Sequence, residues 1–191
     1  LFTGHTMFLT LGVIAVSISQ GQMWEILTQT WVGNLLGSVF VALLYSWGGG
    51  GLLPVDTSLV HTVALAKTSQ SAMALFFKGA LCNWLVCLAI WMAIRTEGAA
   101  KFIAIWWCLL AFIASGYEHS VANMTLFALS WFGHHSDAYT LAGIGHNLLW
   151  VTLGNTLSGV VFMGLGYWYA TPQSERPAPE KIKQSEAAAN N

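Results

Sequence analysis

The sequence predicts an all-α integral membrane protein, and three observations support that class. Hydrophobic residues make up 55% of the 191 residues and charged residues only 8%, whereas soluble domains carry about 25% charged residues. Apolar stretches close to the length of a membrane-crossing helix, roughly 20 residues, recur along the chain. The ten Trp and nineteen Gly agree with this class, because Trp anchors the ends of membrane helices and Gly is common inside them.

Composition and motifs also narrow the function. The formal net charge of −1 gives no indication of a nucleic-acid partner. Cys82, Cys87 and Cys108 lie in apolar stretches at spacings that fit neither a zinc site nor a disulfide framework, so we interpret them as small buried hydrophobic residues. The sequence contains no nucleotide-binding loop and no hydrolytic nucleophile–base pattern. We therefore expect no enzymatic activity, no metal and no cofactor.

The first part of the chain is predicted to hold apolar segments that end at a break. They are a half-span over residues 1–18, a polar loop with a short helix over 19–30, and a span over 31–47. Four consecutive Gly at 48–51 and then Pro54 predict the break. Residues 57–67 predict a short helix at the membrane interface, because their apolar residues share one helical face: Leu59, Val60, Val63 and Ala66.

The second part alternates apolar spans with polar connections. The predicted elements are a span over 72–94, a charged turn over 95–101, an apolar element over 101–132, a polar turn over 133–137 and a span over 139–169. Residues 1–170 would thus form one membrane domain. Residues 171–191 are rich in Pro, Glu, Lys and Ala without apolar periodicity, which predicts a disordered tail.

The apolar element at 101–132 is too long for one straight crossing, which needs only roughly 20 residues. Its middle, at 116–124, reads GYEHSVANM and brings an acid, an imidazole, a hydroxyl and an amide together. This pattern predicts a helix broken at the polar stretch. Broken backbone at membrane depth is tolerated only where protein or a water-filled cavity covers it. The break is therefore a candidate substrate site.

Positive charges set the expected orientation. Arg95 and Lys101 flank one turn, and Arg176, Lys181 and Lys183 lie in the tail. An even number of predicted crossings separates the two groups, so they lie on the same side of the membrane. By the positive-inside rule that side is the cytoplasm, which makes the C-terminus cytoplasmic.

The two halves of the chain contain similar segments. GNLLGS at 33–38 resembles GNTLSG at 154–159, and residues 1–7 would then correspond to the break at 118–124. Each half would hold a span, a broken span and a span with a buried Gly-Asn. Three elements per half make the halves run in opposite directions, an inverted repeat with its site at the midplane. On this interpretation the first half lacks its opening span and part of its broken helix, so we expect an N-terminally truncated chain.

Three segments resemble signatures of the formate/nitrite transporter family. GALCNWLVCLA at 79–89 resembles a long and specific signature, LFTG at 1–4 resembles the end of another, and EHSVAN at 118–123 resembles the central histidine motif. The resemblance runs from residue 1 to about 170 and is strongest to the bacterial nitrite channel. It implies an aquaporin-like inverted repeat with two broken helices and six spans per complete protomer. It also implies a homopentamer in the bacterial inner membrane, with a nitrite pore in each protomer.

Two residues are expected to act directly on an anion. Lys78 is the only Lys or Arg inside an apolar span and is either a fixed charge or a lysine whose head reaches the interface; the resemblance favours drawing anions to the pore. His119 is either a midplane proton or hydrogen-bond donor or a histidine satisfied within the core. The break and the family motif favour the functional role, and an anion crossing the membrane could be coupled to a proton.

Further residues are expected to line the pathway or support it. Thr3 offers a hydroxyl to the same site, unless it bonds its own helix backbone. Asn123 and Asn155 either hold the broken segments or contact substrate. The resemblance implies apolar constrictions at Leu1 and Phe112, which would exclude hydrated ions. Glu118 would orient the imidazole or cap the broken helix, and a supporting role is favoured for it.

Other functions remain open at this point. Formate and hydrosulfide are small monovalent anions that the spacing cannot separate from nitrite. A membrane electron-transfer subunit would need haem between opposed histidines, for which His119 and His146 are conceivable ligands. A pore for neutral solutes would have no need of Lys78.

Overall fold

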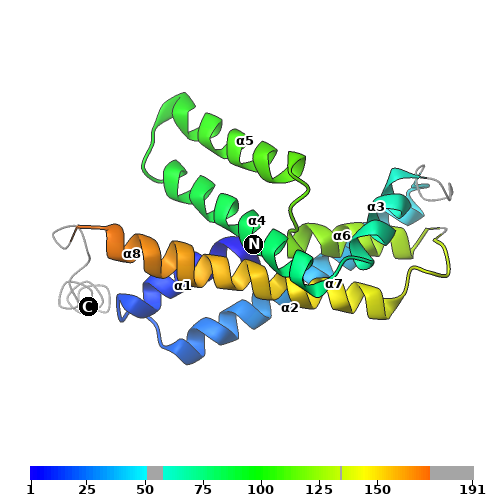
Figure 1. The fold of residues 1–191 in the computed structure, drawn as a ribbon, viewed down its shortest axis with the longest axis horizontal. Coiled ribbons are helices and arrows are strands. Elements are labelled where there is room, and N and C mark those ends of the chain that lie inside the picture. Colours follow the sequence, from blue (N-terminus) through cyan, green and yellow to red (C-terminus); the bar gives the residue numbers. More distant parts are fainter. Residues whose placement is uncertain (51–57, 134, 173–191) are drawn as a thin grey trace.

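The computed structural model describes residues 1–50, 58–133 and 135–172, and the regular elements in these ranges are all helices (Figure 1). In chain order they are α1 (Phe2–Ile14), α2 (Gln20–Trp47), α3 (Leu59–Thr68), α4 (Ala72–Ala93), α5 (Gly98–Ala114), α6 (Ser120–Trp131), α7 (Leu141–Leu157), the π-helix η1 (Ser158–Leu165) and α8 (Gly166–Ala170). This confirms the predicted all-helical class. The later part of the predicted break, at 51–57, and the predicted tail from 173 onward lie outside the described residues.

Within the described ranges, three helices are long and apolar enough to cross a membrane. They are α2, α4 and the continuous helix Leu141–Ala170, which comprises α7, η1 and α8. Two shorter apolar helices, α1 and α5, accompany them. The predicted spans over 72–94 and 139–169 therefore form nearly as expected.

The polar loop predicted over residues 19–30 is wrong, because α2 is one helix of 28 residues that begins at Gln20. The Ser19 side chain accepts the Gln22 backbone N–H at 3.1 Å, and the Gln22 side chain accepts the Ser19 N–H at 2.8 Å. This reciprocal capping stabilises the N-terminus of a helix. Met23 and Leu27 are buried, so the polar residues of this stretch lie on the outer side of a helix that packs by its apolar side.

The short helix predicted over residues 57–67 forms as α3. The side that it buries in the protein is not the predicted apolar face, but one with polar residues. Leu59 is 77% exposed, whereas His61, Ala64 and Thr68 are buried. The reason is a polar contact with α6, in which His61 Nδ1 and Ser130 Oγ are 3.0 Å apart. Apolar periodicity alone could not reveal that contact.

The predicted break in the long apolar element is confirmed. α5 ends at Ala114, α6 begins at Ser120, and the five residues between them are not helical. Gly116 has a φ of 64°, a left-handed conformation that glycine adopts without steric cost. The turn separates α5, which is covered mainly by α4, from α6, which packs against α2.

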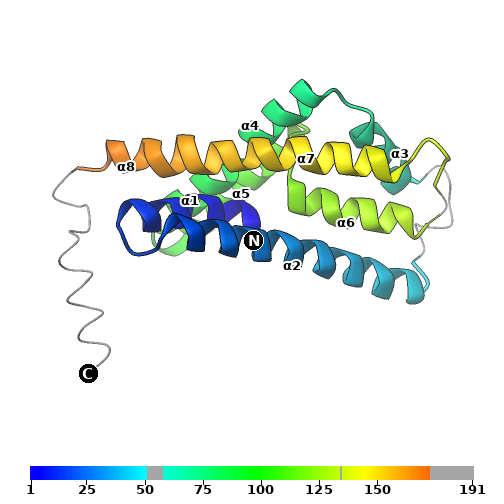
Figure 2. The same cartoon turned by 90° about the horizontal axis from the view of Figure 1, so that it is seen from below.

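The N-termini of α1 and α6 meet near the middle of the molecule, and the two helices run from there in opposite directions (Figure 2). The hydrogen-bond contact between Thr3 in α1 and His119 at the start of α6 joins them, although 116 positions separate the two residues. The positive ends of two helix dipoles therefore point toward one region.

Glycines let the central helices approach closely. A Cβ at Gly79 in α4 would lie 2.8 Å from the Val151 carbonyl oxygen of α7, and one at Gly154 would overlap the Phe76 carbonyl oxygen. A Cβ at Gly159 in η1 would overlap Thr6 of α1. The last span is thus packed against both α4 and α1, and its π-helical stretch was not predicted.

The two Gly-Asn pairs of the predicted repeat have different surroundings. Asn155 is completely buried, but Asn34 is half-buried and donates to the Thr30 carbonyl of its own helix at 2.6 Å. A Cβ at Gly33 would have no atom of the described residues within 4 Å. The expectation of a buried Gly-Asn in each half is therefore wrong for the first half.

Candidate functional site

His119 caps the broken helix with its own side chain. Its Nδ1 accepts the Ala122 backbone N–H at 3.1 Å. A nitrogen that accepts a hydrogen bond carries no proton, so the neutral ring has its proton on Nε2. Nε2 lies 3.2 Å from Thr3 Oγ1 and donates to it in this tautomer. The N-cap thereby fixes which nitrogen of His119 can act as a donor.

Two other predicted pathway residues, Phe112 and Leu1, lie beside this pair or at the same helix ends. The Phe112 ring stacks on the His119 ring with 5.9 Å between ring centroids, so the predicted proximity of these residues is real. Thr3 is fully buried. Leu1 caps α1 and is 69% exposed, and it comes close to the site through the helix start that it shares with Thr3.

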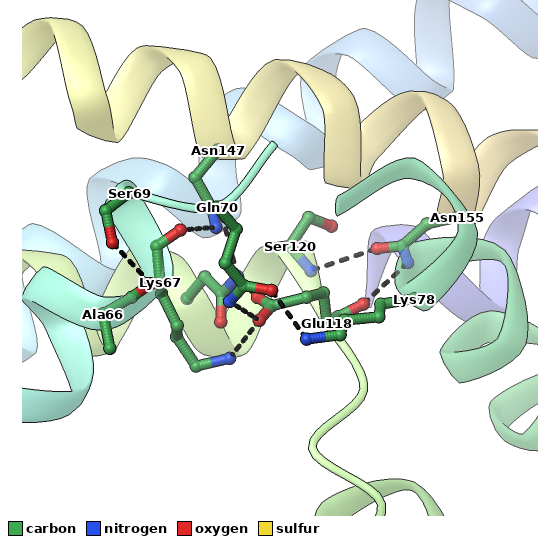
Figure 3. A network of polar contacts seen from close by, with 10 residues as sticks. Ala66, Lys67, Ser69, Gln70, Lys78, Glu118, Ser120, Asn147 and Asn155 are labelled. Atoms are coloured by element: carbon green, nitrogen blue, oxygen red, sulfur yellow. Dashed lines mark hydrogen bonds and ion pairs between the residues drawn. The ribbon is translucent and has the colours of Figure 1, made fainter. Parts of the chain in front are cut away.

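The Glu118 carboxylate anchors the break to the neighbouring helices (Figure 3). The side chain is 1% exposed and forms an ion pair with Lys67 of α3 at 2.8 Å. Gln70 Nε2 donates to Glu118 Oε1 at 3.2 Å, and Asn123 Nδ2 donates to Oε2 at 2.6 Å. A buried carboxylate with an ion pair and two hydrogen bonds is well compensated. Glu118 thus supports the site through α3 and α6.

Asn155 and Asn123 hold the broken backbone in place. The Asn155 side chain donates to the carbonyls of Gly79 at 2.8 Å and Glu118 at 3.1 Å, and it accepts the Ser120 N–H at 3.0 Å. The Asn123 side-chain amide donates to Glu118 Oε2, and it donates to Asn147 Oδ1 at 2.9 Å. The Asn155 contacts satisfy backbone groups that a break leaves open, whereas Asn123 links the side chains of Glu118 and Asn147.

Lys78 is half-buried, and its carbonyl oxygen accepts the Glu118 backbone N–H at 3.4 Å, but its side chain forms no ion pair with the Glu118 carboxylate. Its Nζ donates to Gln70 Oε1 at 2.6 Å. The direct ion pair falls to Lys67 instead, a residue that sequence reasoning placed at the end of an interfacial helix. A lysine beside a buried acid could not be recognised without knowing that α3 packs against α6 and α7.

Sequence reasoning also missed two buried amides. Asn83 donates to the carbonyls of Thr3 at 3.2 Å and Asn155 at 2.6 Å, and Asn147 donates to the Lys67 carbonyl at 2.9 Å. Both are 0% exposed. A polar residue inside an apolar span usually faces the protein interior, and that rule would have selected both.

Nothing in the described residues favours a metal or haem site. No group of three or more His, Cys, Asp or Glu side chains lies together in the described ranges. Both ring nitrogens of His119 have protein partners, and His146 Nε2 donates to the Gln70 carbonyl oxygen at 3.2 Å. The geometry therefore does not support haem ligation by these two histidines.

The sequence and the arrangement of helices are similar to those of known proteins. Residues 1–169 match the model of the formate/nitrite transporter family. The chain belongs to the formate/nitrite transporter family. It is 88% identical over 191 residues to the nitrite transporter NirC of Salmonella typhimurium, which covers all of this chain and 71% of that protein. It is 84% identical over 189 residues to NirC of Escherichia coli, covering 99% of this chain and 70% of that one.

Solved structures of the formate/nitrite transporter family share the fold. A channel described as an FNT family ion channel superposes with a TM-score of 0.88 at 90% identity, over 90% of this chain and 69% of that one. A pentameric formate channel with formate bound superposes with a TM-score of 0.70 at 26% identity, over 80% and 68% of the two chains. The protein is thus a multi-pass membrane transporter of this family. Its relatives are transporters and channels, in line with the expectation that it is not an enzyme.

Proposed function

We propose that the protein passes nitrite through the bacterial inner membrane, through one pore in each protomer of a homopentamer. The two relatives that are 84–88% identical and are named nitrite transporters carry this proposal. Pentamer formation is inferred from the structural similarity to a pentameric channel of the family. The C-terminus lies in the cytoplasm, following the distribution of Arg and Lys.

The anion must cross hydrocarbon, where a bare charge at the bilayer centre costs at least ~2.5 kcal/mol. Three groups lower that barrier in our proposal. Lys78 attracts the anion, and the helix N-termini of α1 and α6 favour negative charge at the centre. His119 then donates its Nε2–H to the anion instead of to the Thr3 hydroxyl. Leu1 and Phe112 exclude hydrated ions on either side.

The bond to Ala122 supports a hydrogen-bonding role for His119 over proton donation. Adding a second proton to the ring would convert Nδ1 from an acceptor into a donor, which removes the N-cap bond of α6. Loss of an N-cap costs about 1 kcal/mol, in addition to the cost of charging a buried imidazole. We therefore propose that nitrite crosses as an anion beside a neutral His119.

Proteoliposomes test this proposal. A nitrite gradient is imposed, and nitrite entry is recorded together with the internal pH from a trapped dye, with protein-free liposomes as the control for nitrous acid leakage. We expect protein-dependent nitrite entry without matching acidification. Entry with one proton per anion would contradict anion conduction, and no entry above the control would contradict nitrite transport.

Formate is the second candidate substrate. The superposition on a channel with bound formate supports it, although at only 26% identity. Parallel flux measurements with formate would rank the two anions.

A further inference from the structure

Gln70 has no role in the function proposed above, yet its side chain lies between those of Lys78 and Glu118. It is in the short connection between α3 and α4. Its Nε2 donates to Glu118 Oε1 at 3.2 Å, and its Oε1 accepts from Lys78 Nζ at 2.6 Å (Figure 3). We propose that Gln70 is a positioning residue that separates Lys78 from Glu118 and keeps the positive charge of Lys78 available to the anion. The inference rests on the proposed transport function.

The two contacts require a side chain that both donates and accepts, and the Gln70 amide does so with two different atoms. A carboxylate only accepts hydrogen bonds, and an ammonium only donates them. The Gln70 oxygen must therefore face Lys78, and its NH₂ group must face Glu118. A Glu at this position could not donate to Glu118, and a Leu could make neither bond. The partners thus determine the orientation of the amide.

The backbone of Gln70 is fixed as well. Its carbonyl oxygen accepts from His146 Nε2 at 3.2 Å, and the carbonyl of nearby Lys67 accepts from Asn147 Nδ2 at 2.9 Å. Both donors belong to α7, so this connection is attached to the last span on one side and to the break on the other. Contacts with α7 and with the break therefore fix the position of Gln70.

The charges of this network do not cancel. It holds two ammonium groups, on Lys67 and Lys78, and one carboxylate, on Glu118. Lys67 neutralises the carboxylate directly at 2.8 Å. Lys78 reaches it only through the neutral Gln70 amide, which leaves one positive charge in excess. Lysine side chains are flexible, so without the amide between them Lys78 could approach Glu118 and lose its attraction for an anion.

The test compares nitrite flux through the reconstituted full-length protein and its variants over a range of nitrite concentrations at low salt. We expect Gln70→Leu to raise the half-saturation concentration about 3- to 10-fold, the size of one ordinary hydrogen bond. The maximal flux should change less than about 2-fold, because capture rather than the central step is affected. High salt should reduce the difference by screening the charge.

A double-mutant cycle identifies Lys78 as the group through which Gln70 acts. In a Lys78→Met background, Gln70→Leu should add no further change. Gln70→Glu keeps the size of the side chain and its contact with Lys78 but cancels the excess charge, so it should weaken capture even if the Leu variant folds poorly. Ser69→Ala is the matched control, because the Ser69 hydroxyl donates to the Ala66 carbonyl of α3 at 3.1 Å.

The outcomes separate this inference from the transport function. Normal half-saturation in Gln70→Leu and Gln70→Glu would overturn the role of Gln70 while leaving nitrite transport intact. A lower maximal flux in both backgrounds would assign Gln70 to the stability of the break instead. Formate is measured in parallel, and absence of both fluxes in the unsubstituted protein would overturn the transport function and this inference together.

Discussion

Among the single residues, His119 combines structural and chemical roles in one ring. Nδ1 holds the start of α6 and Nε2 faces Thr3, so the backbone selects the tautomer that presents a donor at the meeting point of two helices. The motif around His119 was sufficient to predict that this residue lies at the break between α5 and α6. The sequence could not reveal the N-cap bond, because that bond depends on where the helix begins.

Substituting His119 by Asn should separate the two roles. Asn is a good N-cap residue, so α6 should remain stable, but the donor toward Thr3 is lost. We expect nitrite flux to fall at least about 10-fold, the effect of losing one hydrogen bond to a charged group. His119→Ala should show the same loss of flux and additionally lower the free energy of unfolding by about 1 kcal/mol. Equal stability of the two variants would argue against the N-cap role.

Lys67 should matter more for stability than its place near the end of a surface helix would indicate. Lys67→Met leaves the Glu118 carboxylate buried without its counter-ion, a change that typically costs about 3–5 kcal/mol. Unfolding in detergent at increasing denaturant measures the loss. Adding Glu118→Gln should recover part of it, whereas Lys101→Met, at an exposed position of α5, serves as the neutral comparison.

At the scale of the helices, sequence patterns predicted which segments form helices better than they predicted where a helix begins or which of its sides is buried. The broken span and the spans over α4 and α7 were predicted because long apolar runs and a polar interruption are local signals. The start of α2 at Gln20 and the buried side of α3 were not, since capping at Ser19 and the contact between His61 and Ser130 depend on tertiary structure. Lys67 and Gln70 were missed for the same reason, whereas the rule on polar residues inside apolar spans would have selected the buried amides Asn83 and Asn147.

The packing of α4 against α7 depends on glycine. Gly154→Ala should lower the free energy of unfolding by about 1–3 kcal/mol, because its Cβ would overlap backbone atoms of α4 that cannot move aside easily. Gly145→Ala in the same helix is the matched control. A Cβ there has no atom of the described part of the chain within 4 Å, apart from its own helix backbone. Ala favours a helix over Gly, so this variant should be as stable as the parent or more so.

For the whole molecule, the helices that cross the membrane place its connections on two opposite sides. The connection at 135–140 precedes α7, and the turn around Arg95 follows α4. In the proposed orientation, the Arg and Lys distribution puts the Arg95 turn in the cytoplasm. Since α4 and the helix Leu141–Ala170 are each long enough to span the membrane, the connection before α7 should face the outside.

Cysteine labelling of intact cells measures this orientation. Cys introduced at the exposed Ser136 should react with a membrane-impermeant thiol reagent from outside, whereas Cys introduced at the exposed Glu97 should react only after the cells are opened. The three native cysteines are buried, so they should contribute little to the labelling. The reverse pattern would invert the orientation.

The contact between Thr3 and His119 also bears on how the protein is made. The two residues are separated by 116 positions, so their contact cannot form until the α6 region has been synthesised and inserted into the membrane. Contacts between distant parts of a chain form late, because closing the intervening loop is costly in entropy. A half-synthesised chain therefore lacks this contact, and on the proposed function it would have no complete pathway for an anion.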